Sequence, residues 1–137
     1  MGSAARPVPR PQGADAEFYA HCAKGRLCFQ RCLGCRTWRH LPRPMCPRCG
    51  SVDWEWNASS GRGRIYSWTV THQPLHPAFA AETPYVVAVV ELEEGVRMVS
   101  RLRDLPAERL VLDLPVEVSF ERVSEEITLP CFRPLAA

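Results

Sequence analysis

Four cysteines between residues 32 and 49 are the side chains whose type and spacing point most directly to chemistry. They form two pairs, Cys32-Leu-Gly-Cys35 and Cys46-Pro-Arg-Cys49. Two such pairs can place four thiolates around one tetrahedral ion, so the pattern predicts a structural Zn²⁺ site. Sulfur would fill every coordination position, and we therefore expect the metal to stabilise the fold without taking part in catalysis. Iron in a rubredoxin-like site and a pair of disulfides are the alternatives.

The remaining titratable residues do not form a catalytic motif. A nucleophilic thiol needs a base beside it, and no local signature ties a histidine to Cys22, Cys28 or Cys131. We interpret these three cysteines as small buried residues. The acidic pairs Glu93-Glu94 and Glu125-Glu126 fall in predicted turns, where solvated side chains are the simpler interpretation.

Length and charge limit the class of protein. The chain has 137 residues, enough for one domain or two small subdomains. Its 17 basic and 15 acidic side chains are mixed along the sequence and give a net charge of +2, whereas nucleic-acid binders usually have a basic face. The N-terminal residues include no continuous apolar segment, so we expect no signal peptide, no membrane span and a cytoplasmic location.

A tail and a short helix are predicted before the cysteine pairs in the chain. Residues 1–14 contain Pro7, Pro9 and Pro11 and predict a flexible tail or an extended arm on a partner. Residues 15–26 predict a short helix capped by Asp15. One face of this helix carries Phe18, Tyr19, Cys22 and Ala23, and it must pack on the chain itself or on another subunit.

Residues 27–60 predict the zinc ribbon. Strands over Leu27–Arg31 and Trp38–Leu41 would carry the first cysteine pair, and a third strand over 54–56 would follow the second pair. The glycines in Ser59–Gly63 indicate a break before the next unit.

Residues 61–134 predict a five-stranded barrel of the OB type, which makes the fold class mainly β. Strands are expected over 65–71, 85–92, 96–102, 116–121 and 128–132, with a helical turn within 105–112. In the first of them, Tyr66, Trp68 and Val70 should share one face.

Several motifs in this order resemble one known family. Gly-Arg-Leu follows the helix, Cys-Pro-x-Cys-Gly closes the ribbon, and the barrel contains Ser-Gly-Arg-Gly-Arg-Ile-Tyr-Ser-Trp-Thr-Val, Pro-Tyr-Val-Val-Ala-Val-Val, Pro-Val-Glu-Val-Ser-Phe-Glu and Phe-Arg-Pro. From about Asp15 to Pro134, the chain is similar to the acyl-CoA-associated family that joins a rubredoxin-like zinc ribbon to an OB-fold. Asp113 departs from the family pattern, because the family often has Gly at this position before the next strand.

The resemblance implies a non-catalytic accessory subunit of an acyl-CoA-processing complex. Its partner would be a thiolase-like enzyme that supplies the catalytic residues, such as a thiolase, a retro-aldolase or an acyltransferase. The two would form a hetero-oligomer with acyl-CoA at or near the interface. A hotdog-fold enoyl-CoA hydratase is an alternative partner. A single-stranded nucleic-acid-binding OB module is a separate alternative, which the low net charge disfavours.

Contacts with CoA or a partner are predicted at basic and aromatic residues. CoA presents phosphates and an adenine ring, which require Arg or Lys beside an aromatic or apolar wall. The candidates are Phe18, Tyr19, Arg62, Arg64, Tyr66, Trp68, His72 and Phe79. Arg97, Arg101 and Arg103 share one face of a neighbouring strand, and the connection from His72 to Pro84 is long for a hairpin loop. Solvated arginines and an idle surface loop are the alternatives.

Overall fold

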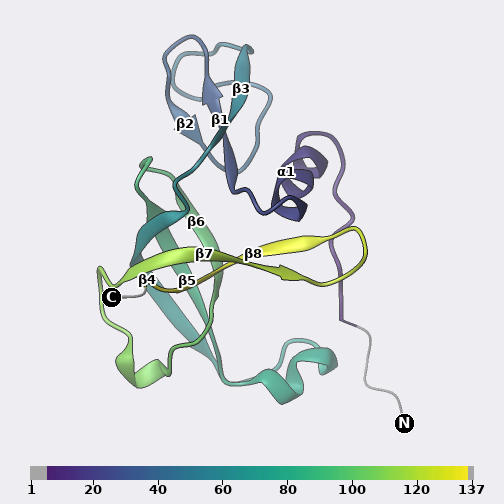
Figure 1. Ribbon diagram of the computed structural model, residues 1–137, viewed down its shortest axis with the longest axis vertical. Coiled ribbons are helices and arrows are strands. Elements are labelled where there is room, and N and C mark those ends of the chain that lie inside the picture. The colour runs from purple at the N-terminus through teal and green to yellow at the C-terminus, as the bar shows by residue number, and fades with distance from the viewer. Residues whose placement is uncertain (1–5, 136–137) are drawn as a thin grey trace.

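The computed structural model describes residues 6–135 and consists of a helix, a ribbon and a barrel in chain order (Figure 1). The first five residues of the predicted tail lie outside the described part. Helix α1 (Ala14–Ala23) precedes a three-stranded ribbon of β1 (Cys28–Cys32), β2 (Trp38–Arg39) and β3 (Trp54–Ala58). The closed barrel contains β4 (Arg62–Thr71), β5 (Tyr85–Leu92), β6 (Arg97–Leu102), β7 (Pro115–Arg122) and β8 (Thr128–Pro134). The mainly β fold class with a five-stranded barrel is confirmed.

Two short 3-10 helices lie in the barrel connections. The first, η1 (Pro77–Glu82), lies within the long connection before β5, and the second, η2 (Ala107–Arg109), lies between β6 and β7. Among residues 6–135, no helix is both long and apolar enough to cross a membrane.

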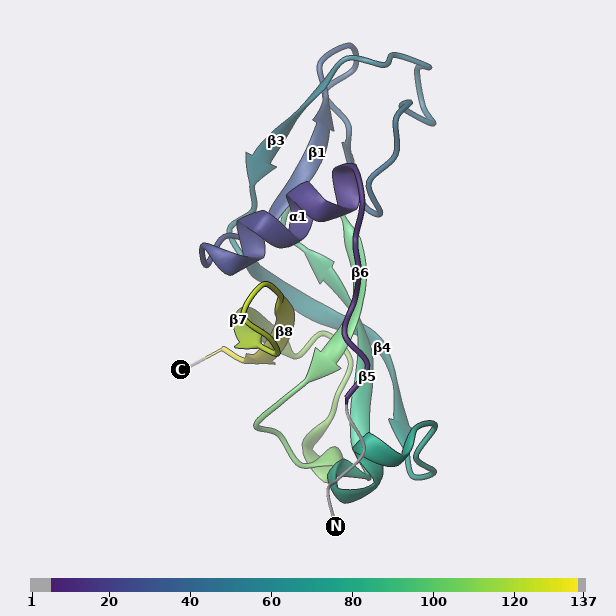
Figure 2. The ribbon, with the colours of Figure 1, turned by 90° about the vertical axis from the view of Figure 1, so that its right-hand side faces the viewer.

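Helix α1 lies in the corner between the ribbon and the barrel (Figure 2). The helix begins at Ala14 with Gly13 as its N-cap, so the prediction of Asp15 as the cap was wrong. Asp15 instead lies in the first turn, where a carboxylate offsets the positive end of the helix dipole. Phe18 and Cys22 are buried one turn apart, but Ala23 is exposed. The apolar face packs on β1 and β8 of the same chain.

A buried glutamine fixes the loop after β2. Gln30 Oε1 accepts hydrogen bonds from Arg39 Nε at 3.0 Å and from the Arg43 backbone N–H at 2.7 Å. Gln30 Nε2 donates to the Arg43 carbonyl at 3.0 Å. This amide is therefore satisfied although its side chain is only 1% exposed. Because the chain turns back to Gln30, β2 ends at Arg39, two residues earlier than predicted.

The barrel follows the strand order β4-β5-β6-β8-β7. Alternate residues of β5 point into the core: Val86, Ala88, Val90 and Leu92. The ladder between β6 and β8 consists of one parallel residue pair, Leu102 with Phe132. The core continues without a break into the ribbon and the helix, since Phe29 and Phe18 belong to the same buried cluster as the barrel residues.

A β-bulge in β4 overturns one expectation from the sequence. The register with β5 shifts between Ile65 and Ser67. The extra residue moves Tyr66 out of the alternation, so Ile65 is buried while Tyr66 is 49% exposed. Tyr66 therefore does not share the inward face of Trp68 and Val70.

Gly63 permits close pairing of β4 with β5. A Cβ atom at this position would lie 2.4 Å from the Glu91 carbonyl oxygen, closer than two such atoms can approach. We expect Gly63→Ala to force the two strands apart and to lower the free energy of unfolding by about 1–3 kcal/mol, as overpacking does in other cores. Urea denaturation measures the change. Ser67→Ala, an exposed site in the same strand, is the matched control. Equal stability of the two variants would contradict the steric argument.

Candidate metal centre and contact surfaces

The four ribbon cysteines converge on one point. Cys32 ends β1, Cys35 lies in the turn after it, and Cys46 and Cys49 lie in the connection from β2 to β3. Their sulfur atoms all lie within 4.8 Å of one another, with Cys32 to Cys49 at 3.5 Å and Cys35 to Cys46 at 3.7 Å. Zinc–thiolate bonds of about 2.3 Å in a tetrahedron require sulfur atoms about 3.8 Å apart. The residues fit a structural zinc ion, and the cysteines form no disulfides.

Hydrogen bonds to sulfur stabilise the first cysteine pair. The backbone N–H groups of Gly34 and Cys35 donate to Cys32 Sγ at 3.3 and 3.4 Å. The Thr37 hydroxyl lies 3.1 Å from Cys35 Sγ, and this hydrogen bond lowers the pKa of the Cys35 thiol to about 6. These hydrogen bonds favour the thiolate form at Cys32 and Cys35, whereas the neighbouring Cys32 side chain raises the pKa of Cys49 to about 11.

The three other cysteines are buried, as interpreted from the sequence. Burial raises the pKa of Cys22 to about 12 and also raises the pKa values of Cys28 and Cys131. Thiols of this kind remain protonated at neutral pH and are poor nucleophiles.

Glu94 forms hydrogen bonds with a distant segment of the chain, whereas the sequence indicated a solvated turn residue. Its carboxylate accepts hydrogen bonds from the Ser59 hydroxyl and from the Ser60 backbone N–H, the latter at 3.0 Å. It therefore ties the segment between ribbon and barrel to the β5–β6 turn. Only the tertiary contact identifies this role.

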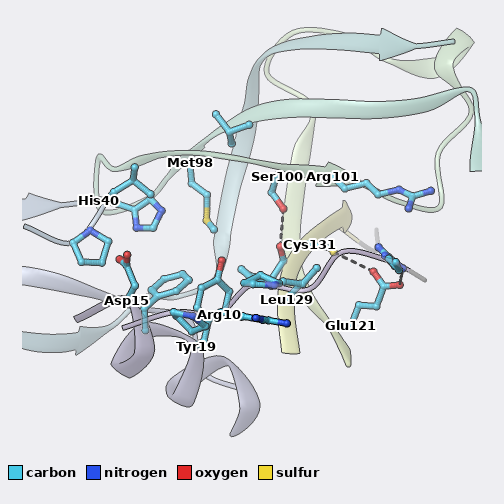
Figure 3. A pocket seen from close by; sticks show the side chains of 18 residues that line it. Arg10, Asp15, Tyr19, His40, Met98, Ser100, Arg101, Glu121, Leu129 and Cys131 are labelled. Atoms are coloured by element: carbon cyan, nitrogen blue, oxygen red, sulfur yellow. Dashed lines mark hydrogen bonds and ion pairs between the residues drawn. The ribbon is translucent and has the colours of Figure 1, made fainter. Parts of the chain in front are cut away.

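The eight predicted contact residues lie in three separate places. Phe18 and Tyr19 line a cavity beside α1, and Phe18 is only 4% exposed because it packs in the core of its own chain (Figure 3). The structure thus leaves Phe18 no outer surface for a partner. Arg62, Arg64 and the exposed Tyr66 lie in the first half of β4, whereas Trp68 is half-buried against the core.

The third place is the connection before β5. His72 is exposed, and Phe79 is half-buried, with its ring 6.2 Å from the ring of Tyr85. The guanidinium of Arg6 lies 5.2 Å from the Phe79 ring centroid. Arg6 also forms an ion pair with Glu121 at 3.2 Å. The described part of the predicted tail therefore contacts the barrel of its own chain.

Four arginines on or next to the barrel strands β4 and β6 are matched by carboxylates of the same chain. Glu91 accepts from Arg64 at 2.9 Å and from Arg97 at 3.0 Å, and these hydrogen bonds lower the pKa of Glu91. Arg97 also lies over the Tyr66 ring at 3.8 Å. Arg101 pairs with Glu82, and Arg103 pairs with Glu121 at 2.7 Å. These pairs depend on strand register, which the sequence alone did not supply.

Sequence reasoning missed His40, which lies at the junction of helix, ribbon and barrel. Its ring centroid is 5.1 Å from that of Phe18 and 5.3 Å from that of Phe29. Burial lowers the pKa of His40 to about 4, so the imidazole is neutral at pH 7. No local motif marks this residue.

These features define a class: a zinc-ribbon and OB-fold protein whose metal is structural. Residues 20–55 match the family described as the rubredoxin-like zinc ribbon domain of ChsH2, and residues 56–121 match the C-terminal OB-fold domain of ChsH2. A DUF35 domain-containing scaffold protein of Methanocaldococcus jannaschii is 34% identical over 75% of this chain and 74% of its own length. The chain belongs to this ChsH2 (DUF35) family, as its motifs indicated.

Two further relatives are closer in sequence. A chain in the solved structure of the Ltp2-ChsH2(DUF35) aldolase is 43% identical with a TM-score of 0.83, over 94% of this chain and 98% of that chain. A probable enoyl-CoA hydratase alpha subunit of Thermomonospora curvata is 44% identical over 96% of this chain. The chain spans only 40% of the length of that hydratase subunit.

Removal of one zinc ligand should unfold the ribbon. Structural zinc contributes on the order of 10 kcal/mol or more of apparent binding free energy in such sites. We therefore expect Cys46→Ala to lose both its metal and its cooperative thermal transition, whereas the control Cys28→Ala keeps one zinc per chain. Elemental analysis and thermal denaturation measure both properties. An unchanged melting temperature after complete chelation would contradict a structural role, and a coloured iron protein would contradict the choice of metal.

His40 should make stability depend on pH between about 6.5 and 4. Its pKa is lowered in the folded chain from the ordinary value of 6.5, so the unfolded state binds the proton first as pH falls. The contribution of the neutral His40 to the free energy of unfolding is fully present above pH 6.5. As the pH falls toward 4, the free energy of unfolding should decrease by up to about 3 kcal/mol.

The control for this prediction is His40→Gln, which retains all four zinc ligands and removes the titrating group. Urea denaturation at several pH values should show a shallower loss of stability in His40→Gln than in the unaltered chain. Parallel curves for the two proteins would assign the loss to other groups.

Proposed function

We propose that this chain is a non-catalytic accessory subunit that binds and stabilises a thiolase-fold enzyme acting on acyl-CoA thioesters. The observation that carries the proposal is the similarity to a chain of the Ltp2-ChsH2(DUF35) aldolase, which extends over 98% of that chain. The scaffold-protein name of the Methanocaldococcus jannaschii relative supports the accessory role.

The chemistry of the described residues supports an accessory role as well. Four sulfur ligands occupy the tetrahedral metal site and leave no position for a substrate. The other three thiols are buried with raised pKa values, and the neutral His40 lies between two phenyl rings. We infer that the partner supplies the catalytic groups.

The partner would bind exposed apolar side chains near the junction of ribbon and barrel. Leu41 in the ribbon is 64% exposed, and Val99 in β6 is 67% exposed, although both side chains are aliphatic. Both residues line the mouth of the same cavity. Aliphatic side chains exposed in one region are typical of protein interfaces.

Acyl-CoA would lie at or near this interface in a hetero-oligomer. Among the predicted contacts, Arg62 is exposed and takes part in none of the ion pairs between described residues. It therefore remains available for a phosphate, whereas Arg64 is already paired with Glu91 and Asp113. We keep Tyr66, Trp68, His72 and Phe79 as lesser candidates.

A hotdog-fold enoyl-CoA hydratase is the second candidate partner. The name of the Thermomonospora curvata relative, a probable hydratase alpha subunit, favours it. The identity of the stable partner distinguishes the two candidates. Nucleic-acid binding is less well supported, because carboxylates of the chain itself match Arg64, Arg97, Arg101 and Arg103.

Co-expression with a thiolase-like partner subunit should yield a stable complex that cleaves or transfers the acyl group. The isolated chain should show no turnover. Leu41→Asp should weaken the complex about tenfold or more, because it places a charge in an apolar contact. Leu112→Asp is the matched control, since Leu112 is 64% exposed, as Leu41 is, and lies between η2 and β7 outside the cavity. The affinity of this chain for the partner and the acyl-CoA turnover of the complex are measured for each variant. Turnover by the pure isolated chain would refute the accessory role.

A further inference from the structure

A cavity of about 500 Å³ lies where α1, the ribbon loop and the barrel meet (Figure 3). Its volume falls in the range of pockets that bind small molecules. Residues from the arm before α1, the helix, the loop after β2, β6 and the β7–β8 hairpin all contribute to its lining. The exposed Leu41 and Val99 are part of its lining.

The cavity follows the seam of the barrel. The strands β6 and β8 pair only at Leu102 and Phe132. Beyond that pair, the Ser100 hydroxyl donates to the Pro130 carbonyl at 2.6 Å, and both residues line the cavity. Residues 98–101 of β6 and 129–131 of β8 line the cavity as consecutive residues. Side chains alternate between the two faces of a strand, so consecutive lining residues mean that the cavity lies along the strand edges. It is therefore a slot between two edges.

The middle of the slot is apolar. Phe18, Met98 and Leu129 contribute side chains there, and Met98 and Phe18 are each no more than 5% exposed. Pro9 and Pro11 of the arm form part of the opposite wall, and a proline has no backbone N–H to present to a ligand. Such a surface favours an aliphatic group over a polar one.

The charged groups of the slot leave one cation unmatched. Arg6 pairs with Glu121, and Arg101 pairs with Glu82, whereas Arg10 forms no ion pair with any residue between 6 and 135. Asp15 lies in the first turn of α1, where the helix dipole offsets its charge. In Figure 3, Arg10 lies beside the middle of the slot, away from Asp15 at one end. A guanidinium next to an apolar slot favours an anion.

We propose that this slot binds a linear aliphatic chain that ends in a carboxylate. The aliphatic chain lies along Phe18, Met98 and Leu129, and the carboxylate accepts hydrogen bonds from Arg10. The site is built from this chain alone, so it does not depend on the partner proposed above.

The probe is octanoate, with octan-1-ol as the control that lacks the charge. The chain contains three methionines, of which Met98 lines the slot and Met45 lies in the ribbon, 55% exposed. Methyl NMR of the zinc-loaded full chain should therefore show a saturable shift of the Met98 signal and none of the Met45 signal. We expect octan-1-ol to bind about tenfold or more weakly than octanoate. An unchanged Met98 signal, or equal affinities, would overturn the proposal.

Substitution of the arginine tests the anion contact. Arg10→Gln should weaken octanoate binding about tenfold or more and leave octan-1-ol binding unchanged. Arg109→Gln removes an exposed arginine that does not line the slot, so it should bind octanoate like the unaltered chain. Equal losses in both variants, or none in either, would refute the assignment of the carboxylate to Arg10.

Octanoyl-CoA distinguishes a free acid from a CoA thioester as the source of the aliphatic chain. Its thioester lacks the carboxylate, and its charges lie on distant phosphates. If octanoyl-CoA shifts the Met98 signal with an affinity equal to or higher than that of octanoate, the carboxylate specificity is wrong. Weaker binding of octanoyl-CoA at this signal supports it.

Discussion

The bonds between four thiolates and one zinc ion are the interaction on which the rest of this structure depends. The outer part of the ribbon has no core of its own, because Leu33, Met45 and Val52 are all about half or more exposed. Metal bonds therefore replace hydrophobic burial in that part of the chain. Closure of the cysteine pairs fixes β1, and β1 in turn presents Phe29 to the core beneath it.

Ribbon, helix and barrel share one core rather than three. Phe29 from the ribbon, Phe18 from the helix and Phe132 from the barrel lie in the same buried cluster, and Figure 2 shows α1 between the other two parts. A rigid junction of this kind can hold surfaces from different parts of the chain in one arrangement. That property suits a scaffold.

The ion pairs on the barrel distinguish arginines that bind carboxylates of the chain itself from arginines that can bind an external anion. Glu91 and Glu121 each bind two arginines, which explains why a row of arginines on one strand is not by itself an anion site. Among the exposed arginines without an ion pair to a described residue, Arg10 and Arg62 are the more informative, because each lies beside a candidate contact surface. One lies at the slot beside α1 and the other at the start of β4.

The sequence by itself determined the zinc site, the order of the elements and the strands of the barrel. These follow from spacing and alternation, which act over a few residues and need no knowledge of distant contacts. Only the tertiary structure decided the exposure of Tyr66, the contact of Glu94 with Ser59 and Ser60, and the burial of His40. Each of these depends on a bulge, a register or a neighbour far along the chain, and such relations exist only after the segments have packed together.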